Sequence, residues 1–207
     1  MKEIFVVTHP EATHHIENRV GGWFDSRLTE RGRDQAEQIA QALSNLVDTG
    51  VALYTSDLRR ARETAAIVGS VLGLAPQELT ALREKSYGEG EGMPDALFRE
   101  RFIPPPLNGE RMDHDEGLAG AETKAHWASR VFSGMDTIMR DPAPQKVIVT
   151  HGGSATLAIA HWIGMPLDSL DTVSFRLDSG SITHLREDDY FHNHAVVTLN
   201  ETSHLSA

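Results

Sequence analysis

Two histidines of this sequence each follow directly on a run of apolar, β-forming residues. His9 follows residues 4–8, and His151 follows residues 147–150. Each run predicts a buried strand, and open α/β sheets bind ligands at the carboxyl edge of their strands. One histidine at a strand end is more often structural, but the repeated context favours a shared role. If the two strands are neighbours, the paired imidazoles suit nucleophilic attack and proton transfer near neutral pH.

Two groups of charged residues fit the same chemistry. Arg59, Arg60 and Arg62 open a predicted helix, where cations oppose the helix dipole unless an anion offsets them. They also fit a solvated helix face on which Arg59 pairs with Glu63. Glu84 follows an apolar stretch and is a candidate general acid, or else an ordinary surface carboxylate.

The elements that would position these residues alternate between strand and helix. Gly152 and Gly153 allow close backbone approach at the start of a helix whose N–H groups would face an anion. A turn at 178–180 predicts a hairpin near the end of the chain. The alternation predicts a three-layer α/β sandwich with a mostly parallel central sheet. The predicted strands span residues 2–7, 51–54, 146–150, 172–177, 181–185 and 196–199, and the predicted helices span 30–47, 56–72 (with Ser56 as N-cap), 122–139 and 154–163.

Residues 83–120 interrupt this alternation with glycines, a run of three prolines and several charges. An aperiodic stretch of this length inside a compact domain is typical of a lid or a substrate-binding excursion. The chain of 207 residues fits one domain. We therefore expect a single domain over residues 1–207 that carries a lid at about 83–120. The cationic candidates in this lid are Arg99, Arg101, Arg111 and His114.

The composition is that of an ordinary globular protein, with 40% hydrophobic and 24% charged residues. A net charge of -11 argues against non-specific nucleic-acid binding, although a local arginine cluster still suits an anionic substrate. The chain contains no cysteine, which excludes disulfides, thiolate metal sites and thiol catalysis. It has no signal-peptide pattern and no apolar run long enough to span a membrane. We expect a cytoplasmic protein that is a monomer or a homodimer.

The ordered set of motifs resembles the histidine phosphatase superfamily, which also contains the cofactor-dependent phosphoglycerate mutases. The resemblance extends over nearly the whole chain, and the set is far more specific than any one motif. Its first motif, Arg-His-Gly-Glu-Thr in the family, reads Thr8-His9-Pro10-Glu11-Ala12 here. The later matches are Ser56, Leu58, Arg60, Ala61, Thr64 and Ala65, then Leu82, Glu84, Gly88, Glu91 and Gly92, then Ala121-Glu122-Thr123, and finally His151-Gly152-Gly153.

The resemblance implies a phosphomonoester hydrolase that acts on a small phosphorylated metabolite. His9 would attack phosphorus and form a phosphohistidine, while Arg60 and His151 would hold the non-bridging oxygens. Glu84 would protonate the leaving oxygen and then activate water. The predicted site thus contains His9, Glu84 and His151, with Thr8, Arg19, Arg60 and Gly152 binding phosphate or substrate. Neither a metal nor a cofactor is implied, because cationic side chains supply the electrophilic surroundings.

Three departures from the family motif bear on activity. Thr8 stands where the family carries a phosphate-binding arginine, Pro10 replaces a glycine, and Ala12 replaces a threonine. Loss of such a donor costs about 10²- to 10³-fold in rate in other enzymes, and Pro10 removes a backbone N–H. The hypotheses are a slower phosphatase, an enzyme whose missing cation comes from elsewhere, or a protein that binds phospho-ligands without turnover. Arg19 is the preferred replacement, before Arg62 and Arg59.

Three further alternatives stay open. His14 and His15 contact the substrate, or they are polar loop residues. A histidine metal site is built from His9, His14, His15, His151 or His192 and His194. A mutase activity is also possible for this family, but its phosphoglycerate mutases are generally longer chains with an added insertion, which disfavours it here.

Overall fold

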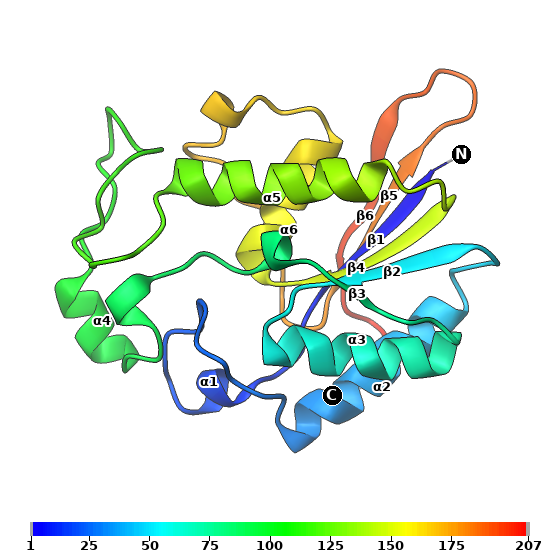
Figure 1. Ribbon diagram of the computed structural model, residues 1–207, viewed down its shortest axis with the longest axis horizontal. Helices are drawn as coiled ribbons and strands as arrows, with labels where there is room; N and C mark the ends of the chain where they lie inside the picture. Colours follow the sequence, from blue (N-terminus) through cyan, green and yellow to red (C-terminus); the bar gives the residue numbers. More distant parts are fainter. Residues whose placement is uncertain (1, 206–207) are drawn as a thin grey trace.

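The computed structural model describes residues 2–205 and contains one six-stranded sheet in the order β3-β2-β4-β1-β5-β6 (Figure 1). The first four of these strands pair in parallel, and β5 and β6 continue the sheet antiparallel. This confirms a mixed sheet whose central part is parallel. The strands are β1 (Glu3–Thr8), β2 (Val51–Thr55), β3 (Gln77–Glu78), β4 (Gln145–Thr150), β5 (Ile182–Glu187) and β6 (His194–Glu201).

Helices cover both faces of the sheet, with α5 and α6 on one side and α2 and α3 on the other (Figure 1). The short helices α1 and α4 lie to the left in that view. No helix within residues 2–205 has the length and apolar character needed to cross a membrane. The helices are α1 (Thr13–Ile16), α2 (Glu30–Ser44), α3 (Arg59–Leu72), α4 (Asp95–Arg101), α5 (Lys124–Met139) and α6 (Gly152–Trp162), with 3-10 turns η1 (Thr80–Leu82), η2 (Gly88–Gly90) and η3 (Leu167–Ser169).

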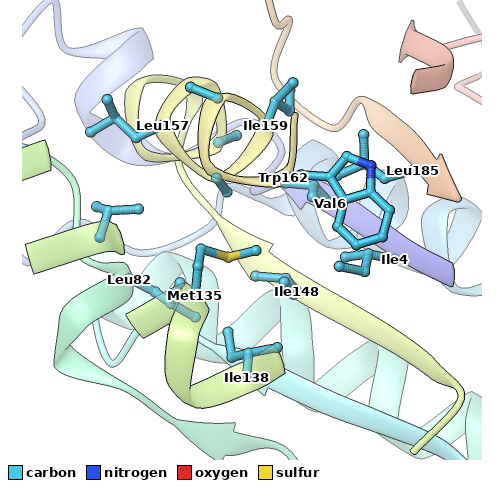
Figure 2. Close-up of a cluster of buried hydrophobic side chains, with 14 of the residues drawn as sticks. Ile4, Val6, Leu82, Met135, Ile138, Ile148, Leu157, Ile159, Trp162 and Leu185 are labelled. Carbon is cyan, nitrogen blue, oxygen red and sulfur yellow. The ribbon is translucent and has the colours of Figure 1, made fainter. Parts of the chain in front are cut away.

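The continuous apolar run of β1 follows from this double covering. Side chains alternate between the two faces of a strand, and both faces are buried, so no position between Ile4 and Val7 can be polar. Ile4 and Val6 pack with Met135 of α5 and Trp162 of α6 (Figure 2). The residues between them, Phe5 and Val7, pack on the α2 and α3 side. The three-layer α/β prediction is therefore confirmed.

Two local predictions are wrong. Residues 172–177 form no strand, because both edges of β5 are already paired, one with β1 and one with β6. The hairpin is instead β5–β6, and the 172–177 segment crosses α6, where Phe175 and Thr156 exchange hydrogen bonds. Ser56 does not cap α3, whose N-cap is Leu58, because the Ser56 side chain turns toward His151.

Candidate active site

The register of β1 and β4 brings the two strand-end histidines together. Thr8 and Thr150 end the two strands and lie opposite each other in a parallel pairing. The residues that follow them, His9 and His151, are therefore neighbours. Their ring centroids are 5.1 Å apart, and both side chains are buried. The two strands that precede these histidines are therefore neighbours, as a shared site requires.

The environment of His9 fixes which ring nitrogen carries the proton. Nδ1 lies 2.9 Å from the carbonyl oxygen of Pro10, which can only accept a hydrogen bond. The proton is therefore on Nδ1, and the lone pair of Nε2 accepts a hydrogen bond from Arg60 Nε at 3.1 Å. Burial, with the nearby Arg60 charge, holds the pKa of His9 well below its usual value. His9 is thus a neutral imidazole with an available lone pair, which is the form a nucleophile requires.

Arg60 is the buried cation of the site and belongs to the first turn of α3. Its Nη1 donates to the carbonyl of Phe24 at 2.8 Å, and its Nη2 donates to the carbonyl of Gly22 at 2.7 Å. The loop that supplies these carbonyls is held by Glu91, whose Oε2 accepts the backbone N–H of Trp23 at 2.6 Å. Burial lowers the pKa of Arg60 to about 10, so the guanidinium stays charged at neutral pH.

His151 presents an unpaired nitrogen. Its Nε2 is 2.8 Å from Ser56 Oγ, and that oxygen accepts the backbone N–H of Leu58 at 3.3 Å. The Ser56 hydroxyl has no other acceptor among the described residues, so it donates to Nε2 and the proton of neutral His151 lies on Nδ1. Nδ1 is buried and has no hydrogen-bond partner among the described residues. A buried N–H of this kind suits a phosphoryl oxygen, because an unsatisfied donor is costly.

Glu84 follows η1 and turns its carboxyl group toward the start of α6. Its Oε2 accepts the backbone N–H of Gly153 at 2.9 Å, and its Oε1 accepts that of Lys85 at 3.0 Å. Burial nevertheless raises the pKa of Glu84. The Gly153 position leaves no room for a side chain, because a Cβ there would lie 2.6 Å from Glu84 Oε1 and 2.5 Å from the Trp127 ring.

His9, Arg60 and Glu84 line a cavity of about 290 Å³, whereas His151 is buried next to His9 and is not among the lining residues. Three of the predicted binding residues, Thr8, Arg60 and Gly152, line it together with His9 and Glu84. Five more lining residues were not predicted, namely Gly21, Gly22, Tyr87, Leu177 and Ser179. Only folding brings the 177–179 segment over the site. The full lining is Thr8, His9, His14, His15, Gly21, Gly22, Arg60, Glu84, Tyr87, Gly152, Leu177 and Ser179.

The hydroxyl of Thr8 is engaged inside the fold. Its Oγ1 donates to the carbonyl of Asp178 at 2.6 Å and accepts the backbone N–H of Ser181 at 3.0 Å. These bonds tie the 178–181 loop to the end of β1. Thr8 therefore lines the cavity without offering its hydroxyl proton to a ligand.

None of the arginines considered as substitutes for the missing one reaches the cavity. Arg19 donates to the carbonyl of Gly92 at 2.7 Å and is close to Glu17, and it is not among the lining residues. The other two are paired elsewhere, Arg59 with Glu63 at 2.9 Å and Arg62 with Glu78 at 3.0 Å. The preferred choice of Arg19 is not supported by its position.

The remaining histidines separate into two groups. His14 and His15 line the cavity, with ring centroids 5.9 and 5.7 Å from that of His9. His194 begins β6, where its register partner is Glu187 at the end of β5, and His192 lies beside that same glutamate. Because β5 runs antiparallel to β1, this pair lies at the opposite end of the sheet from His9. His192 and His194 therefore lie far from the other four histidines, and within residues 2–205 no group of three or more histidine or carboxylate side chains is placed to hold a metal ion.

Comparison with known proteins assigns the family. A sequence model of the histidine phosphatase superfamily (branch 1) matches residues 4–202. The chain therefore belongs to the histidine phosphatase superfamily.

Individual relatives agree with this assignment. A curated relative, the probable phosphoglycerate mutase GpmB of Yersinia pestis (strain Pestoides F), is 28% identical over 212 residues, which cover 99% of this chain and 95% of that protein. Among solved structures, the native mycobacterial glucosyl-3-phosphoglycerate phosphatase superposes with a TM-score of 0.77 at 23% identity, over 97% of this chain and 99% of that one. A putative alpha-ribazole-5'-P phosphatase from Escherichia coli K-12 MG1655 gives a TM-score of 0.78 at 22% identity, over 97% and 96% of the two chains. These two likenesses confirm the fold.

Proposed function

We propose that this protein hydrolyses phosphomonoesters of small metabolites through a phosphohistidine on His9. The observation that carries the proposal is the fixed tautomer of His9, whose Nε2 lone pair lies beside the buried Arg60 guanidinium. The unpaired Nδ1 of His151 and the half-buried Glu84, whose pKa is raised by desolvation, complete the set of functional groups that the reaction needs. Family membership supports the same reading.

In the first step, His9 Nε2 attacks phosphorus and the P–O bond to the leaving group breaks. A phosphoryl oxygen that accepts from Arg60 takes the place of the Nε2 lone pair as acceptor, which frees that lone pair for attack. His151 Nδ1–H stabilises charge on another non-bridging oxygen. Glu84 gives its proton to the leaving oxygen, so the products are an alcohol, phospho-His9 and the Glu84 carboxylate.

In the second step, the Glu84 carboxylate accepts a proton from water, and the water oxygen attacks phosphorus. The N–P bond breaks and returns its electron pair to His9 Nε2, which releases inorganic phosphate. Both steps use Glu84, first as acid and then as base, so its raised pKa serves the first step and its two backbone N–H partners stabilise the anion in the second.

The His9→Ala variant tests this function directly. We expect it to release no phosphate from p-nitrophenyl phosphate, because no other group can form the covalent intermediate. His126→Ala is the matched control, since it removes an exposed histidine outside the cavity and should keep full activity. Phosphate release by the His9 variant at the native rate would disprove the proposal.

Two other activities remain as outcomes of that experiment. Thr8 and Pro10 motivate the hypothesis of a phospho-ligand-binding protein with an impaired site, which predicts phosphate binding without turnover on a broad panel of phosphomonoesters. Mutase activity predicts transfer of the phosphoryl group between hydroxyls of phosphoglycerate in place of release to water. Release of inorganic phosphate that requires His9 rules out the binding protein without turnover. If no phosphoryl group is transferred between hydroxyls of phosphoglycerate, mutase activity is ruled out as well.

A further inference from the structure

Two histidines of α1 form the wall of the cavity next to His9. The ring centroids of His14 and His15 lie 4.0 Å apart, and each ring contacts that of His9. This wall is of interest because the family's arginine is absent at Thr8 and the nearby arginines outside the site are engaged elsewhere. The phosphoryl group would otherwise meet a single arginine, Arg60, in this cavity.

The proton of neutral His15 is fixed on its outer nitrogen. The backbone N–H of Ala12 donates to His15 Nδ1 at 3.1 Å, so Nδ1 must keep its lone pair. Nε2 therefore carries the proton and makes no hydrogen bond to another described residue. His15 is exposed as a residue, but partial desolvation of its ring and the charge of Arg60 lower its pKa, against a raising effect of Glu11, which favours this neutral form.

His14 has the same arrangement through a serine. Its Nδ1 is 2.7 Å from Ser26 Oγ, and Arg60 Nη1 donates to that oxygen at 3.5 Å. The Ser26 hydroxyl has no other acceptor among the described residues, so it donates to Nδ1 and the proton of neutral His14 lies on Nε2. Gly21 gives this nitrogen room at the cavity wall, because a Cβ at that position would lie 2.8 Å from it.

We propose that His15, together with His14, is a neutral donor pair that binds the phosphoryl oxygens in place of the missing arginine. This inference rests on the proposed function, because it needs a phosphate in this cavity. The pair would donate through its Nε2–H groups, whose direction is set by the hydrogen bonds of Nδ1 with Ala12 and Ser26. Phosphate binding would then not require either imidazole to become positively charged. The titratable groups that face His15 are His9, His14, Arg60 and Glu11.

The test is binding of inorganic phosphate, measured by calorimetry with His15→Ala, His15→Glu and Arg60→Gln. Glutamate at this helix position also accepts the N-cap backbone N–H, so His15→Glu keeps the local fold and replaces the donor with an acceptor. We expect about 10-fold weaker binding for His15→Ala and a larger loss for His15→Glu. His126→Ala should bind phosphate like the native protein.

A pH series separates a neutral donor from a cation. Between about pH 7.5 and 9 phosphate is largely dianionic, and the factor lost in His15→Ala should stay constant. Binding through an imidazolium would instead make that factor shrink as pH rises, and native binding would take up a proton that the variant does not.

The possible failures are distinguishable. If His15→Glu binds phosphate as tightly as the native protein while Arg60→Gln binds it weakly, His15 only caps α1 and the inference is overturned. Proton uptake that depends on His15 also overturns it. If Arg60→Gln has no effect, or the native protein binds no phosphate, the proposed function fails as well.

Discussion

At the scale of single residues, the chemistry of the site depends on which ring nitrogen of each histidine carries the proton. A backbone carbonyl places the proton of His9 on Nδ1. The Ser56 hydroxyl donates to Nε2 of His151, so the proton of that ring also lies on Nδ1. In the proposed mechanism the same residue type thus serves as a nucleophile at His9 and as a hydrogen-bond donor at His151. The partners that set these roles, Pro10 and Ser56, belong to the motifs, but only the structure shows which ring nitrogen each of them contacts.

Glu84 carries a prediction at this scale. Because burial raises its pKa, the carboxyl group stays protonated to higher pH than an exposed glutamate, and ester cleavage should slow as the pH rises through that value. Glu84→Gln should remove this decline and reduce kcat by about 10²-fold or more for alkyl phosphates. The loss should be smaller for p-nitrophenyl phosphate, whose leaving group needs little protonation.

Rate measurements on both substrates across pH check this assignment. Equal losses on the two substrates would contradict a role as general acid. If the rate of Glu84→Gln still falls at high pH as in the native protein, a group other than Glu84 causes that fall.

At the scale of elements, the start of α6 joins β4 to Glu84, the proposed general acid. His151 is the N-cap of α6, and two residues later the backbone N–H of Gly153 donates a hydrogen bond to Glu84. Packing around Gly153 is tight because the Trp127 ring, which donates through Nε1 to Ser154 at 3.0 Å, lies against it. The geometry of Glu84 is therefore set by the approach of α5 to α6.

Gly153→Ala should displace Glu84 or Trp127, and displacement of a catalytic group by about 1 Å costs about 10²-fold in rate. Gly152→Ala is the comparison, since a Cβ there would meet only the carbonyl of Leu177 at 3.7 Å. We expect a clearly smaller loss of kcat for Gly152→Ala. Similar activities of the two variants would show that crowding at Gly153 does not position Glu84.

A second prediction at this scale concerns the proposed lid at 83–120. Lys85 is 5% exposed, and its Nζ lies 2.5 Å from Glu116, which ties the later part of this segment to the residue after Glu84. Glu116→Gln should leave that lysine buried without its charge partner and reduce the free energy of unfolding by about 3 kcal/mol. Glu89→Gln, which breaks an exposed pair with Arg101, should cost much less.

Denaturant unfolding and hydrogen exchange of residues 103–120 check this pair. Faster exchange confined to that segment in Glu116→Gln would support a lid that opens locally. Equal stability of the two variants would contradict a structural role of the buried pair.

At the scale of the whole molecule, the fold buries several histidines in neutral form. Burial is the largest cause that lowers the pKa of His9, His14 and His151, and for His14 the pKa falls to about 3. In the unfolded chain these groups titrate near about 6.5. The unfolded state therefore binds more protons below that pH, so stability is lost as the pH falls through about 6.5. The raised pKa values of Glu84 and Glu91 act in the opposite direction.

His14→Gln isolates one contribution to this acid sensitivity. Glutamine can still bond to Ser26, but it does not titrate, so the difference in unfolding free energy between native and variant should shrink as the pH falls. The expected change is up to about 1.4 kcal/mol per pH unit below about pH 6.5. Denaturant midpoints between about pH 5 and 8 measure it, and parallel curves for the two proteins would contradict it.

The sequence by itself determined the layered α/β fold and the principal residues of the candidate site. Apolar periodicity is a local property, and the runs at β1 and β4 required burial on both faces wherever they packed. Of the motif residues, His9, Arg60, Glu84 and Gly152 line the cavity, and His151 is buried beside His9 without being among its lining residues. The strand predicted at 172–177 failed because strand formation also needs a free partner edge, which no local pattern reports.

Only the tertiary structure decided which groups stand near the place of the missing arginine. The backbone of Arg19 bridges to Pro94, and this long-range pairing turns its side chain toward Gly92 and away from the cavity. The short helix α1 brings His14 and His15 to the cavity instead. Loop residues take their positions from hydrogen bonds to distant segments, and the spacing of residues along the chain does not specify those partners.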